Sequence, residues 1–569
     1  MSAKKESKNG GRCLLKEIRA YLRKIGANAL IIGHDDEYQN EMLSPDKERL
    51  AYVTGFTGSA GIAVITSRQA VLFVDGRYVI QAKKQTKFKV IHVPRQTTVA
   101  QWLAKHVKAN SIIAYDPWSH TVAQIDRWAE VCSKRGAQLW PCPQNPIDRF
   151  WIDKPRAPLV HVFPYEKKYA GKTTRQKAGS VRRILREKDV DGFIVANPAT
   201  VSWLLNKRSD AVPYTPIYLG RCFVSQTGRV QELTPELTET FKGKVIGIDG
   251  FETPVKIKQD LIEAGASVRL MANPFALMQG TKNKTEMDGM REAGLKESAA
   301  LCQFFCELEA HPQEGTELSI LKTLEAFRSE NEDYKGHSFA PISAVGAHAA
   351  LPHYEPQPDH EGKLKGASVY LLDTGSQFLC GTTDVTRTIA LKNPNALLIK
   401  RYTQVLKGHI ALARALFPKG TSGAQLDILA RQFLWQDGVD YDHGTGHGVG
   451  TYLNVHETPP SLSKYATEPL QENMVITNEP GFYLKNKFGI RIENMMTVQR
   501  YKKDQFCFEM LTFIPFCDEL IDNEALTEDE RVWLRGYYRH IMEKVYPRVN
   551  VKTQKWLEQK SLKWIHPHQ

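Results

Sequence analysis

The acidic residues that interrupt apolar, strand-like segments in the C-terminal half constrain the fold of this 569-residue chain more than any other feature. In the stretch VYLLDTGSQFLCGTTDVTRTIAL (369–391), Leu371 and Asp373 would share one face of a strand. A turn at the glycines would fold the chain back and bring Asp384 across from Asp373. Two acids placed opposite each other on neighbouring strands repel unless a cation lies between them. We therefore expect a cation-binding site here.

The same pattern returns twice further along the chain. Glu479 lies in the apolar run MVITNEPGFYL just before a Pro-Gly turn, and FGIRIENMMTV alternates so that Arg491 and Glu493 face one way. Two divalent metal ions would balance the charge of the four carboxylates, whereas burying these groups unpaired would be very costly. A donor set dominated by oxygen favours hard ions, for which we expect Mn²⁺, with Co²⁺ and Zn²⁺ as alternatives.

Two histidines four residues apart lie among four glycines in DHGTGHGVG (442–450). Glycine costs the interior of a helix about 1 kcal/mol relative to alanine, so this stretch is not a helical face that presents two ligands. Its glycines instead let the backbone approach another group closely. We predict that His447 is a metal ligand and that His443 lies beside the metal site.

The organisation of the rest of the chain predicts three domains. CLLKEIRAYLRKIGANALII and AGSVRRILREKDVDGFIVA each combine a helical pattern with an apolar strand, which indicates two related α/β domains. The Pro-containing DKPRAPL and a second joint near ANPFALMQGTKNK predict the boundaries 1–152, 153–280 and 281–569. The last domain begins with a long helical pattern, for which we expect Thr285 as the N-cap, and ends in a helical, basic tail.

Composition excludes several classes of protein. The net charge is +13, but the Lys and Arg residues are scattered outside any nucleic-acid-binding motif, so we expect no nucleic-acid partner. No apolar run approaches the roughly 20 residues of a membrane span, so we expect no membrane association. The N-terminus shows no secretory signal and the nine cysteines form no framework. We therefore expect reduced thiols and a cytoplasmic location.

Five stretches, taken in order, resemble one enzyme family: DTGSQFLCGTTDVTRT, HGTGHGVG, NVHETP, TNEPGFY and GIRIEN. From about residue 283 to 515 the chain resembles the pita-bread metallopeptidases, and it is most similar to the long, three-domain, cytosolic type of aminopeptidase P. The N-terminal stretches AYVTGFTGSAGIAVIT and VLFVDGRYVIQA are similar to that family's first domain. The resemblance implies an α/β and α+β fold, with two creatinase-type N-terminal α/β domains followed by a C-terminal pita-bread catalytic domain.

The resemblance also implies roles for individual residues. Two metal ions would be held by Asp373, Asp384, His447, Glu479 and Glu493, of which Asp384 and Glu493 bridge the ions. Catalytic roles would fall on His353, His443, His456 and Glu479, and substrate contacts on Arg77, His353, His456 and Arg491. The alternatives are an ion pair with Asp75 for Arg77 and an ordinary surface or core position for His353.

The implied activity is an Xaa-Pro aminopeptidase, which releases the N-terminal residue from peptides with proline in the second position. The ions would activate a bridging water for attack on the carbonyl before proline, and Glu479 would pass the proton to the leaving nitrogen. The resemblance further implies a homodimer built through the C-terminal domain. The alternatives are a prolidase, which is restricted to dipeptides, and a non-catalytic pita-bread binding protein.

Overall fold

The computed structural model describes residues 7–565, with side chains from Leu14 onward, and its contacts divide the chain into two compact units. The first unit comprises the chain up to Tyr165 together with Lys172–Phe275. The second comprises Glu166–Gly171 and the chain from Ala276 onward. The three-domain division, with boundaries after residues 152 and 280, stays a prediction.

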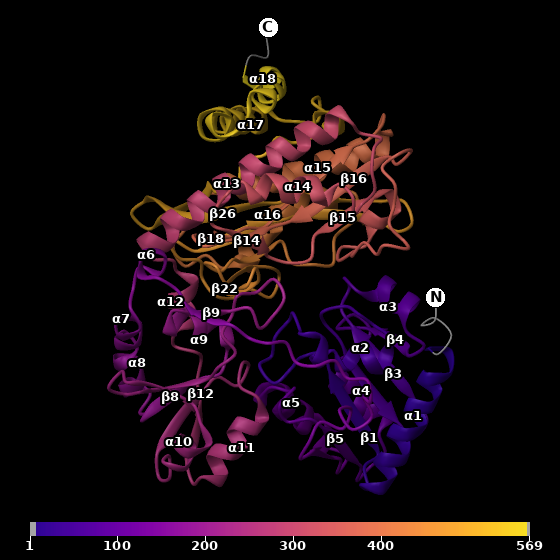
Figure 1. Ribbon diagram of the computed structural model, residues 1–569, viewed down its shortest axis with the longest axis vertical. Helices are drawn as coiled ribbons and strands as arrows, with labels where there is room; N and C mark the ends of the chain where they lie inside the picture. Colours follow the sequence, from indigo (N-terminus) through magenta and orange to yellow (C-terminus); the bar gives the residue numbers. More distant parts are fainter. Residues whose placement is uncertain (1–6, 566–569) are drawn as a thin grey trace. The chain divides into compact units, whose positions relative to one another are not determined.

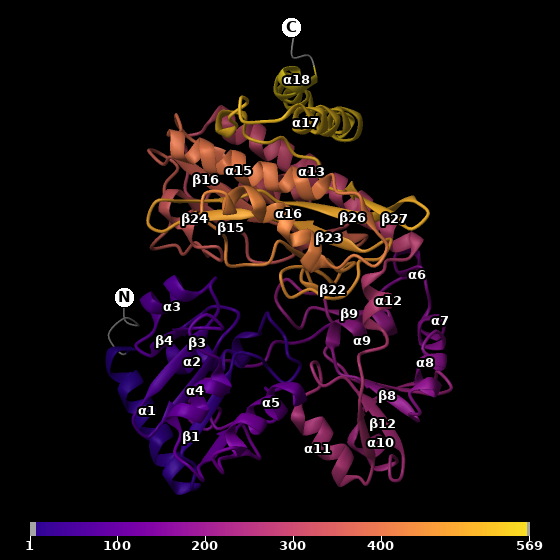
Figure 2. The same ribbon diagram turned by 180° about the vertical axis from the view of Figure 1, so that it is seen from behind.

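Two mixed sheets with flanking helices, and the two-stranded sheet of β7 (Val162–Pro164) and β9 (Lys207–Ser209), form the first unit (Figures 1 and 2). The first sheet has the order β4-β3-β2-β1-β5-β6, and its strands are β1 (Ala29–Gly33), β2 (Ile62–Thr66), β3 (Ala70–Val74), β4 (Lys89–His92), β5 (Ile112–Tyr115) and β6 (Gln138–Pro141). The second has the order β11-β10-β8-β12-β13, with strands β8 (Gly192–Val195), β10 (Cys222–Ser225), β11 (Val230–Glu232), β12 (Val245–Ile248) and β13 (Ser267–Leu270).

The predicted helix-then-strand plan is present in both halves of this unit. Helix α1 (Ser7–Lys24) precedes β1 and buries Ile18, and α8 (Arg182–Glu187) precedes β8. Side chains of both sheets, Val64 of the first and Ile194 of the second among them, pack into one hydrophobic cluster. This shared core accounts for the two α/β halves forming a single unit.

Helices cover several short sheets in the second unit (Figures 1 and 2). The longer helices of this unit are α13 (Lys284–Ala310), α14 (Leu321–Ser329), α15 (Ala396–Ala413), α16 (Gly423–Trp435), α17 (Glu528–His540) and α18 (Val551–Ile565), and the shorter ones are α6 (Lys167–Ala170) and α12 (Ala276–Gly280). One sheet has the order β20-β27-β26-β23-β21-β22, with strands β20 (Phe417–Pro418), β21 (Gly446–Gly448), β22 (Glu457–Leu462), β23 (Val475–Asn478), β26 (Asn494–Lys502) and β27 (Gln505–Met510). The others are formed by β14 (Tyr334–His337), β15 (Ile342–Val345), β16 (Val369–Thr374), β17 (Ser376–Phe378), β18 (Gly381–Thr382), β19 (Val385–Ala390), β24 (Gly481–Leu484) and β25 (Phe488–Arg491).

The two strands that carry the first acids are antiparallel neighbours, in a register that differs from the predicted one. Asp373 of β16 lies opposite Thr386 of β19, and Asp384 lies one residue before β19. The prediction that Asp384 lies across from Asp373 is therefore wrong. The reason is that the intervening chain forms the short paired strands β17 and β18, which set where β19 begins. Both acids nevertheless lie at the same end of the strand pair.

Helix α13 approaches its neighbours closely through glycine. A Cβ atom added at Gly294 would lie 2.2 Å from the carbonyl oxygen of Leu511. The helix begins two residues earlier than expected, so its N-cap is Asn283 rather than Thr285. The Asn283 side chain accepts hydrogen bonds from the backbone N–H groups of Thr285 and Glu286.

Two other expectations concern thiols and membranes. The eight cysteines with described side chains are free, as predicted, and the side chain of Cys13 lies outside the described part. Among the residues that the structure describes, we find no helix with the length and apolarity that crossing a membrane requires.

The close approach of α13 predicts opposite effects for one substitution at two helical glycines. Gly294→Ala should destabilise the protein by about 1–3 kcal/mol, because the added methyl group would overlap a backbone oxygen that cannot rotate away. Gly536→Ala, in α17, should stabilise it by about 0.5–1 kcal/mol, because open space surrounds that position. Urea denaturation of both variants measures the difference, and equal effects would contradict the packing described here.

Candidate metal centre

The structure brings the predicted metal ligands together in the second unit. Asp384, His447 and Glu493 each place one possible ligand atom within 4.8 Å of the other two. The Nε2 atom of His447 lies 3.4 Å from Asp384 Oδ2 and 3.4 Å from Glu479 Oε1. Asp373 joins this group through Arg491, which donates to Asp373 Oδ2 and to Thr386, whose hydroxyl in turn donates to Glu493 Oε2.

The five predicted metal ligands lie in or next to different strands, whose arrangement brings their side chains together. Asp373 lies near the end of β16 and Asp384 just before β19, while His447 lies in the middle of β21. Glu479 follows β23 directly, and Glu493 occupies the short link between β25 and β26. Because the acids lie at or beside strand ends, the apolar residues that flank them can pack while the carboxylates converge.

Burial leaves the carboxylates of this cluster poorly satisfied by the protein. Asp373, Asp384 and Glu493 are only 8%, 4% and 1% exposed. Within the described residues, Asp373 Oδ1 and Glu493 Oε1 are buried and have no hydrogen-bond partner. Buried carboxylate oxygens without partners are strongly unfavourable, so these residues fit a bound cation.

The electrostatics of the cluster also favour a bound cation. Burial and the neighbouring carboxylates raise the pKa of Glu493 well above its usual range, and burial is also the main cause of the raised pKa values of Asp373 and Glu479. Arg491 supplies a single fixed positive charge beside Asp373. With His447 neutral, four carboxylates and one guanidinium leave a net negative charge, which divalent cations can neutralise.

His447 is oriented as a metal ligand would be. Its Nδ1 atom lies 2.9 Å from the carbonyl oxygen of Gly448, so Nδ1–H can donate there and leave the Nε2 lone pair directed at Asp384 and Glu479. Burial alone would lower the pKa of His447, but these two carboxylates raise it to about 9. Without a metal, a proton on this imidazole therefore acts as the local cation.

A tyrosine that the sequence analysis did not single out connects His443 to Arg491. The Tyr483 hydroxyl accepts a hydrogen bond from Arg491 Nη1 at 2.7 Å and lies 2.8 Å from His443 Nε2. Because the carbonyl oxygen of Gly444 can only accept, Nδ1–H of His443 donates to it, and in the neutral imidazole Nε2 then accepts from the Tyr483 hydroxyl. Glu479, Gly481 and Tyr483 are spaced at the strand period of two, which is the signal that could have revealed this residue.

The other predicted histidines lie in the same unit. The rings of His456 and His447 are nearly perpendicular, with centroids 4.4 Å apart. His353 directly follows Pro352, whose carbonyl oxygen lies 3.4 Å from Arg491 Nη2. The guanidinium of Arg491 is buried among Asp373, Thr386 and Tyr483. The roles of these residues toward a substrate stay predictions.

Arg77 lies in the first unit, where its side chain forms an ion pair with Asp75. The distances are 3.0 Å from Nε to Oδ1 and 2.7 Å from Nη2 to Oδ2. The guanidinium also lies over the ring of Tyr78, 5.2 Å from its centroid. The ion pair with Asp75, the alternative considered for Arg77, is therefore present in the structure. A contact between Arg77 and a peptide stays a prediction.

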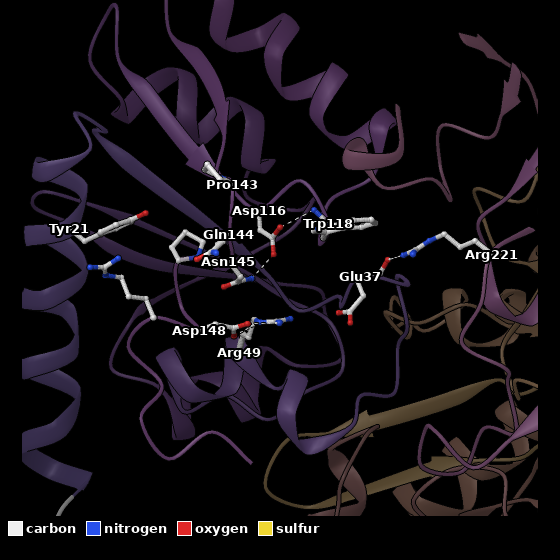
Figure 3. Close-up of a pocket in the computed structure, with 12 residues that line it drawn as sticks. Tyr21, Glu37, Arg49, Asp116, Trp118, Pro143, Gln144, Asn145, Asp148 and Arg221 are labelled. Carbon is white, nitrogen blue, oxygen red and sulfur yellow. Dashed lines mark hydrogen bonds and ion pairs between the residues drawn. The ribbon is translucent and has the colours of Figure 1, made fainter. Parts of the chain in front are cut away.

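A polar cavity of about 880 Å³ in the first unit is distinct from this cluster (Figure 3). Its charged lining residues are largely paired with one another, since Arg49 binds Asp148 and Asn145 donates to Asp116. Arg221 lies over the ring of Trp118 and donates to the carbonyl oxygen of Glu37. The cavity thus lacks the uncompensated negative charge that characterises the cluster in the second unit.

Models of known protein families match most of the chain. The model of metallopeptidase family M24 matches residues 288–500, and the C-terminal region of peptidase M24 matches residues 504–563. Two models of the creatinase/prolidase N-terminal domain match residues 15–149 and 153–231. The M24 match contains all five predicted metal ligands.

Individual relatives match almost from end to end. A probable Xaa-Pro aminopeptidase P of Pyrenophora teres f. teres is 34% identical, over 96% of this chain and 92% of its own length. Aminopeptidase P1 of Lotus japonicus is 31% identical, over 93% and 96%. The crystal structure of X-prolyl aminopeptidase from Caenorhabditis elegans, described as a cytosolic enzyme with a di-nuclear active site, has a TM-score of 0.92 and 31% identity, over 97% and 99%.

The chain belongs to the aminopeptidase P family of M24 metallopeptidases. As in this family, creatinase-type N-terminal α/β domains precede a pita-bread catalytic domain, so the predicted fold class is confirmed. The two alternatives, a prolidase and a non-catalytic binding protein, are not favoured, because the near-complete matches are to aminopeptidases.

The charges of the cluster predict how the stability of the metal-free protein depends on pH. The pKa of His447 is about 9 in the folded chain, against 6.5 for an ordinary histidine. Its stabilising effect is therefore complete below about pH 6.5 and is lost as pH rises toward 9. The raised pKa values of Glu479 and Glu493 act in the same direction, because the folded chain keeps protons that the unfolded chain releases.

We therefore expect the Tm of the chelated protein to fall between pH 6.5 and pH 9. The Mn²⁺-loaded protein is the control, and its Tm should fall less because bound cations replace the protons. Differential scanning calorimetry at several pH values measures both forms. A Tm of the chelated protein that stays level or rises across this interval would refute the description of the cluster.

Tyr483→Phe tests the link between His443 and Arg491. The variant loses the oxygen that both residues contact, so we expect kcat/KM for Xaa-Pro peptides to fall about 10- to 100-fold, with an unchanged metal content. Tyr465→Phe is the control, because that side chain is 68% exposed. Equal activity of the two variants would show that the Tyr483 hydroxyl has no part in the site.

Proposed function

We propose that the protein is a metal-dependent Xaa-Pro aminopeptidase, which hydrolyses the bond between the first residue of a peptide and a proline in the second position. The observation that carries this proposal is the buried cluster of acids with unpaired oxygens in a chain of the aminopeptidase P family. Asp373, Asp384, His447, Glu479 and Glu493 would hold two divalent ions. The oxygen-rich donor set supports Mn²⁺.

When bound, such ions supply Lewis acidity toward a carbonyl group and lower the pKa of water to near neutrality. Glu479 is suited to carrying a proton, because its side chain is 18% exposed and its pKa is raised by burial. We assign it the transfer of a proton from water to the departing proline nitrogen. His443 lies close to this carboxylate, with 3.9 Å between Nδ1 and Glu479 Oε2, and would line the pocket.

The remaining predicted residues would act on the substrate. His456, next to the imidazole of His447, would donate a hydrogen bond to the developing negative charge on the carbonyl oxygen. His353 and Arg77 would contact the peptide, and Arg491 would hold Asp373 in place while bordering the substrate pocket. Arg491 donates hydrogen bonds to both Asp373 and Tyr483. It would therefore position the metal-binding carboxylate of Asp373 and also help to shape the substrate pocket.

We further propose a cytoplasmic location and a homodimer formed through the C-terminal domain. The free state of the described thiols supports a reducing compartment, and the similar enzyme from Caenorhabditis elegans is described as cytosolic. Analytical ultracentrifugation of the full chain measures the dimer directly.

A peptide assay after chelation and Mn²⁺ addition tests the activity. We expect release of arginine from Arg-Pro-Pro, its loss on chelation, and no release from Arg-Ala-Pro. Asp373→Asn and Glu493→Gln should each lower kcat/KM more than about 100-fold, because each removes a charge from the metal cluster. Glu472→Gln, which removes an exposed ion pair with Arg500, is the matched control and should retain activity.

Three results would contradict the proposal. Cleavage of Arg-Pro alone, with Arg-Pro-Pro left intact, would identify a dipeptidase. Undiminished turnover by Asp373→Asn or Glu493→Gln would show that the acidic cluster is not required for catalysis. Full activity after chelation, with the metal content shown to be zero by elemental analysis, would show that the activity does not depend on metal ions.

A further inference from the structure

We propose that Glu317 is a positioning residue, whose buried carboxylate fixes the loop 346–361 and thereby holds His353 in place for the substrate. This inference rests on the proposed function, because it assigns His353 a contact with the peptide. Glu317 belongs neither to the metal cluster nor to its direct partners, and it lies in the segment between α13 and α14.

The carboxylate of Glu317 is fully buried and accepts four hydrogen bonds. Oε1 accepts from the backbone N–H of Val345 at 2.7 Å and lies 2.8 Å from His348 Nδ1. Oε2 accepts from the Tyr354 hydroxyl at 2.8 Å and from the backbone N–H of Gly362 at 2.5 Å. These partners lie at both ends of the loop and at two points within it.

Backbone contacts reinforce this arrangement from the other side. The N–H group of Glu317 donates to the oxygen of Gly362, and its carbonyl oxygen accepts from the Ser343 hydroxyl at 2.6 Å. Gly362 is closely packed, since an added Cβ atom would lie 2.2 Å from Val345 Cγ2. The rings of His348 and Tyr354 are stacked, with centroids 4.5 Å apart. The loop is therefore closed around one charged group.

The opposite side of the loop contacts the strands that carry the metal cluster. The carbonyl oxygen of Pro352 lies 3.4 Å from Arg491 Nη2, the same nitrogen that donates to Asp373. The backbone of Ala349 packs directly on Gly489 of β25, where an added Cβ atom would lie 1.7 Å from the Ala349 oxygen. The chain at 352–354 is thus held between Arg491 and Glu317, and His353 is the residue in the middle.

The negative charge of Glu317 is essential to this arrangement. Burial alone would raise its pKa, but the hydrogen bonds from His348, Gly362, Val345 and Tyr354 hold the pKa below its usual value, so the group is ionised at neutral pH. A glutamine of the same size has only one acceptor oxygen. Its amide nitrogen would face two of the four donors, so one end of the loop and one point within it would be released.

Glu317→Gln, measured beside His353→Ala and the double variant, tests the inference. We expect Glu317→Gln to lower kcat/KM for Arg-Pro-Pro about 10- to 100-fold with two metal ions still bound, because a small displacement of a substrate-contacting group has effects of this size. If Glu317 acts through His353, the double variant should be no slower than His353→Ala alone. Glu361→Gln is the matched control, because Glu361 lies in the same loop and, within the described part of the chain, its side chain accepts one hydrogen bond, from the backbone N–H of Leu318.

Hydrogen exchange of residues 346–361 provides a readout independent of catalysis. We expect exchange in this segment to accelerate at least tenfold in Glu317→Gln and to stay unchanged in Glu361→Gln. If Glu317→Gln does not fold, Tyr354→Phe removes one of the four hydrogen bonds and is judged by the same two measurements.

Unchanged exchange in the variants, wild-type activity of Glu317→Gln, or losses that add in the double variant would each overturn the inference. Loss of bound metal in Glu317→Gln would also overturn it, since the effect would then not pass through His353. If the wild-type protein fails to cleave Xaa-Pro peptides, the proposed function fails, while hydrogen exchange still decides whether Glu317 holds the loop.

Discussion

Uncompensated negative charge at the ends of buried strands is the constraint on which the second unit depends. Asp373, Asp384, Glu479 and Glu493 converge where, among the residues described, Arg491 alone supplies a fixed positive charge in contact with them. Arg387 stabilises the surrounding backbone without neutralising these acids, because its guanidinium donates to carbonyl oxygens, Asn494 and Tyr537 rather than to a carboxylate. The chain thus folds around a site whose charge must be completed by cations from solution.

This arrangement couples metal binding to stability and to protonation. Protons on His447 and on the carboxylates occupy the cluster when no cation is present, so metal binding and proton release are linked. Cations that bind only the folded chain stabilise it by mass action. The network around Arg491 extends this coupling outward, since it connects Asp373 through Tyr483 to His443 and through Pro352 to the loop that carries His353.

The sequence predicts the centre of this site better than its surroundings. An acid within an apolar, strand-like stretch of sequence is visible as a violation of the strand pattern, so the four carboxylates could be found without coordinates, although the structure places three of them just outside the strands. The register of Asp373 and Asp384 could not, because it depends on the strands β17 and β18, which are three and two residues long. Glu317 gave no signal, because its partners are backbone groups and side chains 28 to 45 residues away that only the folded chain assembles.

The most direct test of the central claim is the number and proximity of the ions that the folded protein holds. Chelated protein titrated with Mn²⁺ can be measured by elemental analysis and by electron paramagnetic resonance. If the buried acids form a binuclear centre, two ions will bind per chain and their spins will couple, and Glu493→Gln will lose the coupling. Saturation at a single ion, or two ions with the spectrum of isolated Mn²⁺, would contradict this account.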